Sequence, residues 1–167
     1  MGSRAQGSDV IISELSSAVI DLDIYVEWLR DTRNNSFIEA VRPDYSILEL
    51  ELYLKEKLGK PDVRFWGIFL TSGEFIGTVK LEPIDFLEGS AWLGILIGST
   101  TNRGKGYGAR AINKVITYAL TELDLKVLYL GVHLDNVGAF ELYKKLGFEI
   151  FDIKGKSISM KKVLQPE

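Results

Sequence analysis

The sequence predicts a single α/β (α+β) domain built on a mixed central sheet with flanking helices. Its 167 residues suit one domain with a sizeable core. An apolar strand at 92–98, a glycine-rich loop, a helix at 107–122 and a strand at 126–133 form a right-handed parallel unit. Hairpins are predicted on both sides of that unit, so the sheet must also contain antiparallel pairs.

The other elements follow from hydrophobic periodicity and from helix start and stop signals. The pair Ser46 and Glu49 forms a capping box, and the helix that it begins ends at Gly59. The segment 34–45 is predicted to be a loop or an irregular helix. The remaining predictions are a strand at 10–15, helices at 21–31 and 46–58, strands at 64–70 and 75–82, a loop at 83–89, a short helix capped by Asp135 and Asn136, and a hairpin of strands at 148–153 and 157–163.

Composition excludes several classes of protein. The chain has no cysteine, which excludes disulfides and thiolate metal sites, and its one histidine excludes a histidine-cluster site. No apolar run approaches a membrane span, and no basic run is dense enough for nucleic acid. Residues 1–8 are small and polar and lack an apolar signal core, so we expect a tail that is disordered or was added during cloning. A cytoplasmic protein without metal is the expectation.

The net charge of −3 conceals an asymmetry between the two parts of the chain. Residues 1–90 carry sixteen acidic and nine basic side chains, whereas residues 91–167 carry seven acidic and eleven basic ones. This distribution is compatible with chance. It is equally compatible with an anionic cofactor bound by the second part and a cationic substrate bound by the first.

The glycine-rich loop predicts an anion site. Gly104, Gly106 and Gly108 alternate just before the helix at 107–122, so the backbone there can adopt positive φ and approach a ligand closely. The helix that follows directs its free N–H groups and the positive end of its dipole at the loop, and phosphate is the usual occupant of such a position.

Two common phosphate motifs fit this loop poorly. A P-loop needs four residues between its first two glycines, but five separate Gly98 from Gly104, and no hydroxyl residue follows Lys105. The dinucleotide fingerprint is matched literally by Gly104, Gly106 and Ala109. However, the acidic residue expected at the end of the next strand is absent.

A third pattern, [RQ]-x-x-G-x-[GA], is matched by Arg103, Gly106 and Gly108. Here the chain resembles the GNAT superfamily of acyl-CoA N-acyltransferases. The resemblance extends to 132–148, where Asn136, Ala139, Tyr143, Gly147 and Phe148 match the family's N-x-x-A-x-x-x-Y-x-x-x-G-F segment. It implies a GNAT-like fold over residues 9–167, in which the parallel central strands splay apart and the pantetheine arm of coenzyme A lies between them.

The resemblance also implies roles for individual residues. The loop would hold the coenzyme pyrophosphate, and the backbone of 96–98 would bind pantetheine. Arg103 would bind phosphate or brace the loop, and Asn136 would bind pantetheine, cap its helix, or do both. The residues implied to bind acetyl-CoA are Leu96, Ile97, Gly98, Arg103, Gly104, Lys105, Gly106, Tyr107, Gly108, Ala109, Asn136 and Tyr143.

The implied reaction is direct transfer of an acetyl group from acetyl-CoA to a primary amine in a ternary complex. Tyr143 would protonate the departing thiolate as general acid, and the alternative interpretation is a core tyrosine that only packs on the sheet. The general base is open, with Glu82 the first candidate and Asp85, Glu88 and His133 as others. The acceptor would be a small molecule or a peptide, and a homodimer stays open. The rival interpretation is a non-catalytic acyl-CoA-binding or regulatory domain.

Overall fold

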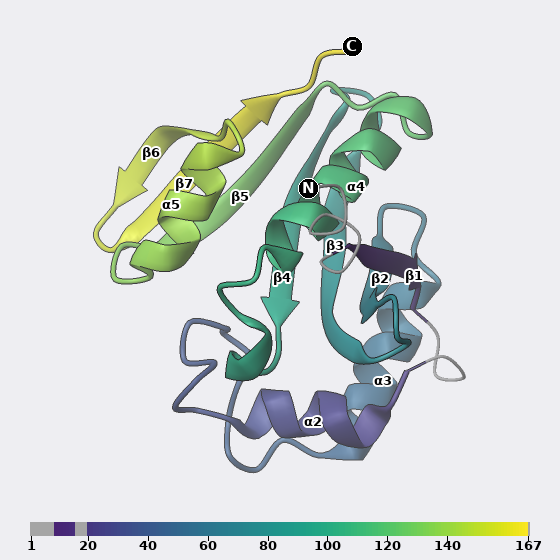
Figure 1. The fold of residues 1–167 in the computed structure, drawn as a ribbon. Helices are drawn as coiled ribbons and strands as arrows, with labels where there is room; N and C mark the ends of the chain where they lie inside the picture. Colours follow the sequence, from purple (N-terminus) through teal and green to yellow (C-terminus); the bar gives the residue numbers. More distant parts are fainter. Residues whose placement is uncertain (1–8, 16–19, 167) are drawn as a thin grey trace, which may run out of the picture.

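A computed structural model describes residues 9–15 and 20–166. The predicted tail at 1–8 lies outside the described residues. One seven-stranded mixed sheet runs through the molecule in the order β1-β2-β3-β4-β5-β7-β6 (Figure 1). The strands are β1 Val10–Glu14, β2 Arg64–Leu70, β3 Phe75–Asp85, β4 Ser90–Ile97, β5 Val127–His133, β6 Glu149–Lys154 and β7 Ser157–Val163. The helices are α2 Leu22–Arg30, α3 Ile47–Leu58, the 3₁₀ turn η1 Thr100–Asn102, α4 Tyr107–Thr121 and α5 Val137–Lys145.

The two parallel strands in the centre of the sheet separate soon after they meet. β4 and β5 pair only at Ser90–Val127, Ala91–Leu128 and Trp92–Tyr129. Beyond Trp92, β4 continues along β3 as far as Ile97, and β5 continues along β7 as far as His133. The sheet therefore opens into two leaves, which Figure 1 shows diverging from their common end. The predicted splay of the central strands is present.

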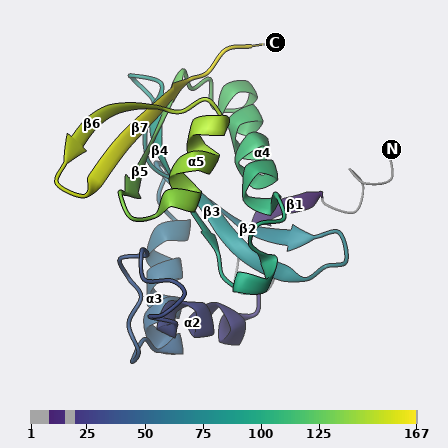
Figure 2. The ribbon, with the colours of Figure 1, turned by 60° about the vertical axis from the view of Figure 1, so that its left-hand side comes forward.

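Helices cover both faces of this split sheet, and each face has its own core. α4 and α5 pack over one face, where α4 buries Ala111, Ile112, Val115 and Ala119. α2 and α3 pack against the other face, around Trp28, Leu50 and Phe65. Figure 2 shows α4 beside α5, and α2 with α3 at the other end of the molecule. The opening between the leaves thus lies between two rigid layers. No helix among the described residues is both long and apolar enough to cross a bilayer.

Most element predictions are confirmed to within one or two residues, and one boundary is wrong. The strand predicted to end at Glu82 continues to Asp85, because a shift of register between Leu81 and Ile84 lets the strand pass Pro83. The predicted loop at 83–89 is thereby shortened to a turn. In that turn the Asp85 carboxylate accepts hydrogen bonds from the N–H groups of Leu87 and Glu88, both at 3.0 Å.

Candidate active site

The start of α4 presents a set of backbone N–H donors that have no acceptor within the helix. Gly104 and Gly106 have φ of +73° and +84°, conformations that side chains resist. Gly106 is the N-cap and provides no capping side chain, and the first intrahelical bond runs from Arg110 N–H to Gly106 O at 3.1 Å. The N–H groups of residues 107–109 consequently have no helical acceptor, as the first turn of any helix requires. These N–H groups lie where the glycine spacing predicts an anion site.

A cavity of about 470 Å³ extends from this helix terminus into the opening between β4 and α5. It is lined mainly by the glycine loop, by β4 and by one face of α5. Ten of the residues predicted to bind the cofactor lie on its wall: Leu96, Ile97, Arg103, Gly104, Gly106, Tyr107, Gly108, Ala109, Asn136 and Tyr143. Gly98 and Lys105 do not line it. We call this the first cavity.

The backbone groups of β4 that face the opening differ from those predicted to bind pantetheine. The Gly98 N–H donates to Ile76 O at 3.0 Å, toward β3. Since hydrogen-bonding direction alternates along a strand, Leu96 also faces β3, while Ile95 and Ile97 face the opening. Gly98 is moreover covered by Trp28, whose indole occupies the space that a Cβ would need. The groups free for a ligand are therefore both backbone groups of Ile95 and the N–H of Ile97, rather than the run 96–98, because the Ile97 C=O accepts from Arg103.

Arg103 braces the loop through protein acceptors. Its guanidinium donates to Ile97 O at 3.0 and 3.2 Å and to Asn34 O at 2.8 Å, and it also bonds the Asn35 side chain. Asn35 is 2% exposed, and its amide donates to Trp28 O at 2.8 Å and to Gly98 O at 3.3 Å. Of the two predicted roles for Arg103, the structure displays the bracing one. We call this group the Asn35–Arg103 brace.

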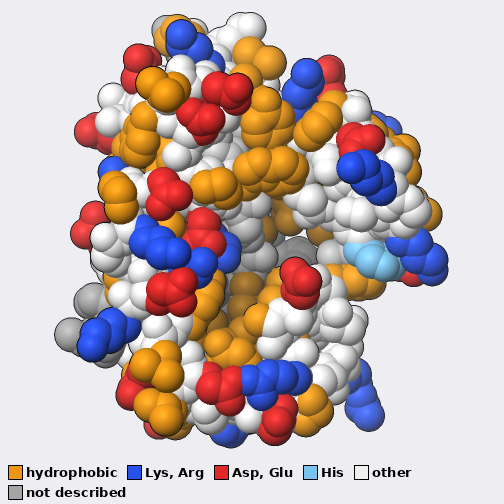
Figure 3. Space-filling view, turned by 180° about the vertical axis from the view of Figure 1, so that it is seen from behind, with side chains coloured by type: hydrophobic (Ala, Val, Ile, Leu, Met, Phe, Trp, Pro, Cys, Tyr) orange, Lys and Arg blue, Asp and Glu red, His pale blue; other side chains and the backbone are white. Residues whose placement is uncertain are grey.

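A second cavity of about 540 Å³ lies on the other side of the opening. Figure 3 shows the back of the molecule, where a central hollow is floored by apolar side chains and bordered by charges of both signs. The wall includes aromatic residues of α2, α3 and β2 and of the segment before α3, among them Tyr25, Tyr53, Phe65 and Tyr45. Six residues line both cavities: Phe37, Ile38, Ile95, Leu96, Asn136 and Tyr143. The two cavities therefore meet at the splayed strands.

Tyr143 stands where the cavities meet and is the residue of α5 that is buried. Its position follows from helical spacing, since Asn136, Ala139 and Tyr143 share one face of α5. Burial raises the pKa of the Tyr143 hydroxyl to about 12. The hydroxyl therefore keeps its proton at neutral pH, which is the state required of a proton donor. Asn136 caps α5 by accepting the Ala139 N–H at 3.4 Å, so its capping role is present.

The residues predicted as candidates for the general base are poorly placed to accept a proton from a ligand in either cavity. Glu82 is ion-paired with Lys57 at 2.8 Å and lines neither cavity. Asp85 is the last residue of β3 and Glu88 lies in the turn that follows, and neither of them lines either cavity. His133 does line the second cavity, but its Nδ1 accepts the N–H of Asp135 at 3.1 Å, so the neutral ring carries its proton on Nε2.

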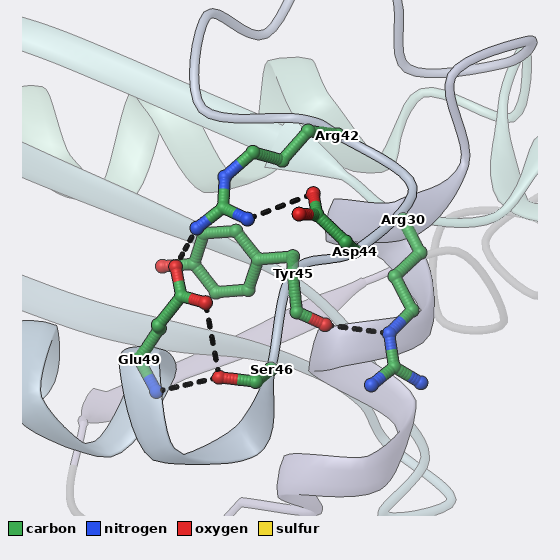
Figure 4. Close-up of polar contacts among 6 residues, drawn as sticks. All are labelled: Arg30, Arg42, Asp44, Tyr45, Ser46 and Glu49. Atoms are coloured by element: carbon green, nitrogen blue, oxygen red, sulfur yellow. Dashed lines mark hydrogen bonds and ion pairs between the residues drawn. The ribbon is translucent and has the colours of Figure 1, made fainter.

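The segment before α3 is held in place by charged side chains (Figure 4). Arg42 pairs with Asp44 at 2.9 Å and with Glu49, and its guanidinium lies 5.1 Å from the centre of the Tyr45 ring. Arg30 of α2 donates to Tyr45 O at 2.6 Å. Within the capping box, Ser46 accepts the Glu49 N–H, whereas the Glu49 carboxylate accepts from the Ser46 hydroxyl instead of a backbone N–H. These contacts fix Tyr45 in the wall of the second cavity.

Comparison with known proteins shows the family to which this chain belongs. Residues 9–149 match the family model of the acetyltransferase (GNAT) domain. A spermidine N(1)-acetyltransferase of Vibrio cholerae is 31% identical over 147 residues, 83% of this chain and 84% of that protein. The corresponding protein of Escherichia coli K12 is 35% identical over 109 residues, 65% of this chain and 57% of its own length.

Solved structures with the same fold include proteins of the same kind. The crystal structure of spermidine N-acetyltransferase from Vibrio cholerae in complex with CoA and spermine has a TM-score of 0.81 and 26% identity, covering 94% of this chain and 96% of that one. A dodecameric form of that enzyme has a TM-score of 0.73 and 26% identity, covering 94% and 95%. The chain belongs to the GNAT acetyltransferase family. It is an N-acetyltransferase that transfers an acetyl group from acetyl-CoA to an amine.

Sequence reasoning missed three residues of the site. Asn35 falls in the segment 34–45, which is predicted only to be a loop or an irregular helix, although Asn35 is the buried centre of the brace. Lys80 and Glu39 line the second cavity, yet nothing in their local sequence marks them. Within 9–15 and 20–166, no group of three histidine or carboxylate side chains could hold a metal.

The brace generates a test that separates it from a phosphate contact. Replacing Arg103→Met removes hydrogen bonds that tie the glycine loop to β4 and to residues 34–35. We expect a loss of about 1–2 kcal/mol in the free energy of unfolding without ligand, measured by urea denaturation. Lys105→Met, which removes an exposed charge from the same loop, should leave that free energy within about 0.5 kcal/mol. Equal stability of the two variants would contradict the bracing role.

Proposed function

We propose that the first cavity binds acetyl-CoA and that the second cavity binds the amine acceptor. The observation that carries this proposal is the meeting of the two cavities beside Tyr143, in the opening between β4 and β5. Two substrates entering from opposite faces would bring their reacting groups together there. Such an arrangement suits direct transfer in a ternary complex, because no covalent acyl-enzyme has to carry the acetyl group between sites.

The free N–H groups of residues 107–109 would bind the coenzyme pyrophosphate. The pantetheine arm would continue along β4, where it can bond the backbone groups of Ile95 and the N–H of Ile97, which β5 leaves unpaired; the Ile97 C=O is taken by Arg103. Asn136 contributes an amide on the opposite wall. This route ends at Tyr143, so the thioester would lie at the boundary of the second cavity.

In the chemical step, the neutral amine nitrogen attacks the thioester carbonyl carbon and forms the C–N bond. A backbone N–H of β4 that faces the opening would stabilise the oxyanion. The intermediate then expels the thiolate as the C–S bond breaks, and the Tyr143 hydroxyl gives its proton to the sulfur. The nitrogen loses its extra proton, and the tyrosinate is reprotonated from solvent. The products are the N-acetylated amine and free CoA.

For the proton lost by nitrogen, Glu39 is a better candidate than Glu82. Of the acidic side chains in the described part of the chain, Glu39 is the one on the wall of the second cavity. It is exposed, so a water molecule could carry the proton between the nitrogen and this carboxylate. Glu82 is occupied by Lys57 and lies off the wall.

The acceptor is a small-molecule or peptide amine, and the whole of residues 9–167 would form the catalytic domain. Relatives named for spermidine make a polyamine the first compound to test. A dodecameric relative makes self-association, including the homodimer, a reasonable expectation for this chain.

Replacing Tyr143→Phe should lower kcat for acetyl transfer by about a hundredfold, the low end for loss of a general acid. The Kd for CoA should stay within about twofold, since the ring still packs. Thiol release and calorimetry measure the two quantities. Tyr118→Phe, a tyrosine of α4 packed against Trp66, is the matched control and should keep full activity. Unchanged kcat in Tyr143→Phe would reduce Tyr143 to a packing residue.

The pH dependence of kcat gives an independent test. Because burial raises the pKa of Tyr143 to about 12, its protonated form is retained as pH rises and is lost only near that value. We therefore expect kcat to show no fall up to about pH 10, measured at saturating concentrations of both substrates. A fall with an apparent pKa of 8 to 9 that disappears in Tyr143→Phe would show that the proton is held less tightly than proposed.

A further inference from the structure

The wall of the second cavity is not acidic, although the first ninety residues carry a net negative charge. Aromatic and apolar side chains dominate it, and its formal charges in the described part of the chain are one glutamate, Glu39, and one lysine, Lys80. The acidic side chains that give the first ninety residues their negative charge lie elsewhere. Glu49 and Asp44 pair with Arg42, and Glu82 pairs with Lys57. The cavity itself is therefore not an acidic site.

Lys80 of β3 lines this cavity, and its side chain packs on the neighbouring strand β4. It lies on β3 directly opposite Gly94 of β4. Because Gly94 has no side chain, the Lys80 chain packs there, with its Cε 3.3 Å from the place that a Gly94 Cβ would occupy. Its ammonium ends 3.0 Å from the Tyr53 hydroxyl, 5.7 Å from the Tyr53 ring centre and 5.8 Å from the Phe65 ring centre.

The Lys80 ammonium can donate further hydrogen bonds. An ammonium carries three N–H donors, and one is used on Tyr53. Within residues 9–15 and 20–166, Lys80 makes no ion pair, and Glu82 is taken by Lys57. A half-buried cation among aromatic rings attracts an anion more strongly than one in bulk water does, and it repels a second cation for the same reason. An acceptor with several ammonium groups is thus poorly matched to this wall.

We propose that the preferred acceptor is a primary amine that also carries a carboxylate on an aromatic or apolar body, and that Lys80 binds this carboxylate. The inference rests on the proposed function, and it names the substrate class for the same site. The Lys80 ammonium donates to one carboxylate oxygen, and the Tyr53 hydroxyl can turn to donate to the other. The aromatic side chains Tyr25, Tyr45 and Phe65 enclose the body. Glu39 lies on the same wall to attract the ammonium before it is deprotonated.

A matched pair of acceptors tests this directly. 4-(Aminomethyl)benzoate and benzylamine share the aromatic body and the amine, and they differ only in the carboxylate. For the unmodified enzyme, we expect kcat/KM with the benzoate to exceed that with benzylamine by about tenfold or more, chiefly through KM. Spermidine should be a poorer acceptor than the benzoate.

Variants of Lys80 assign the preference to this side chain. Lys80→Met should lower kcat/KM for the benzoate by about tenfold while leaving benzylamine within about threefold, and Lys80→Arg should restore most of the preference. Lys60→Met, which removes an exposed lysine beyond α3, is the control. A purely structural lysine would change both acceptors equally, so an equal loss would overturn the proposal, as would a wild-type preference for benzylamine or spermidine.

Calorimetric titration of the CoA-saturated protein with both compounds separates this inference from the proposed function. If no amine is acetylated, the proposed function fails. Selective binding of the benzoate, lost in Lys80→Met, would still support the anion site, whereas equal binding of both compounds would refute it. If benzylamine and spermidine are good acceptors and the benzoate is not, the acetyltransferase assignment stands and the Lys80 inference fails.

Discussion

The early separation of β4 from β5 is the constraint on which the site depends. The strands share three residue pairs and then diverge, which leaves backbone donors and acceptors on their inner edges without a strand partner. Unpaired backbone groups are costly to bury. The divergence is tolerated because each strand keeps its outer neighbour, β3 for one and β7 for the other. It also creates both cavities and aligns free backbone groups for a ligand that carries amides of its own. The separation of β4 from β5 therefore accounts both for the unpaired backbone groups and for the space in which an extended cosubstrate can bind.

Other features keep that opening in shape. α4 and α5 form a core on one face, while α2 and α3 form a second core on the other, so neither leaf can collapse toward its neighbour without losing packing. The Asn35–Arg103 brace joins the connection after α2, the end of β4 and the glycine loop. The glycine loop and the connection after α2 are thus held together by direct hydrogen bonds. Tyr143 lies where the two cavities meet, and its burial keeps the hydroxyl protonated at neutral pH, as the proposed role of proton donor requires.

Local patterns predicted the fold, and they also pointed to residues that the structure gathers around the first cavity, since both depend on short-range signals. Alternating glycines before a helix, and the spacing of Asn136 and Tyr143 on one helix face, are visible in any window of the sequence. The acceptor side depends on contacts between distant residues. Asn35 acts through Gly98, 63 residues away, and Lys80 is placed by the missing side chain of Gly94. The net charge of residues 1–90 is compatible with a cationic acceptor, but of their sixteen acidic side chains, all in the described part of the chain, Glu39 alone lines the second cavity. Local sequence could not reveal which charges remain free.

The most direct test of this account is a crystal structure of the protein with acetyl-CoA. The pyrophosphate should accept hydrogen bonds from the N–H groups of residues 107–109, and the pantetheine amides should bond Ile95 and Ile97 in the opening between β4 and β5. The sulfur should then lie within hydrogen-bonding distance of the Tyr143 hydroxyl, with the acetyl group facing the second cavity. A coenzyme bound with its phosphates away from the start of α4, or with its sulfur remote from Tyr143, would contradict the central claim that the splayed strands form the transfer site.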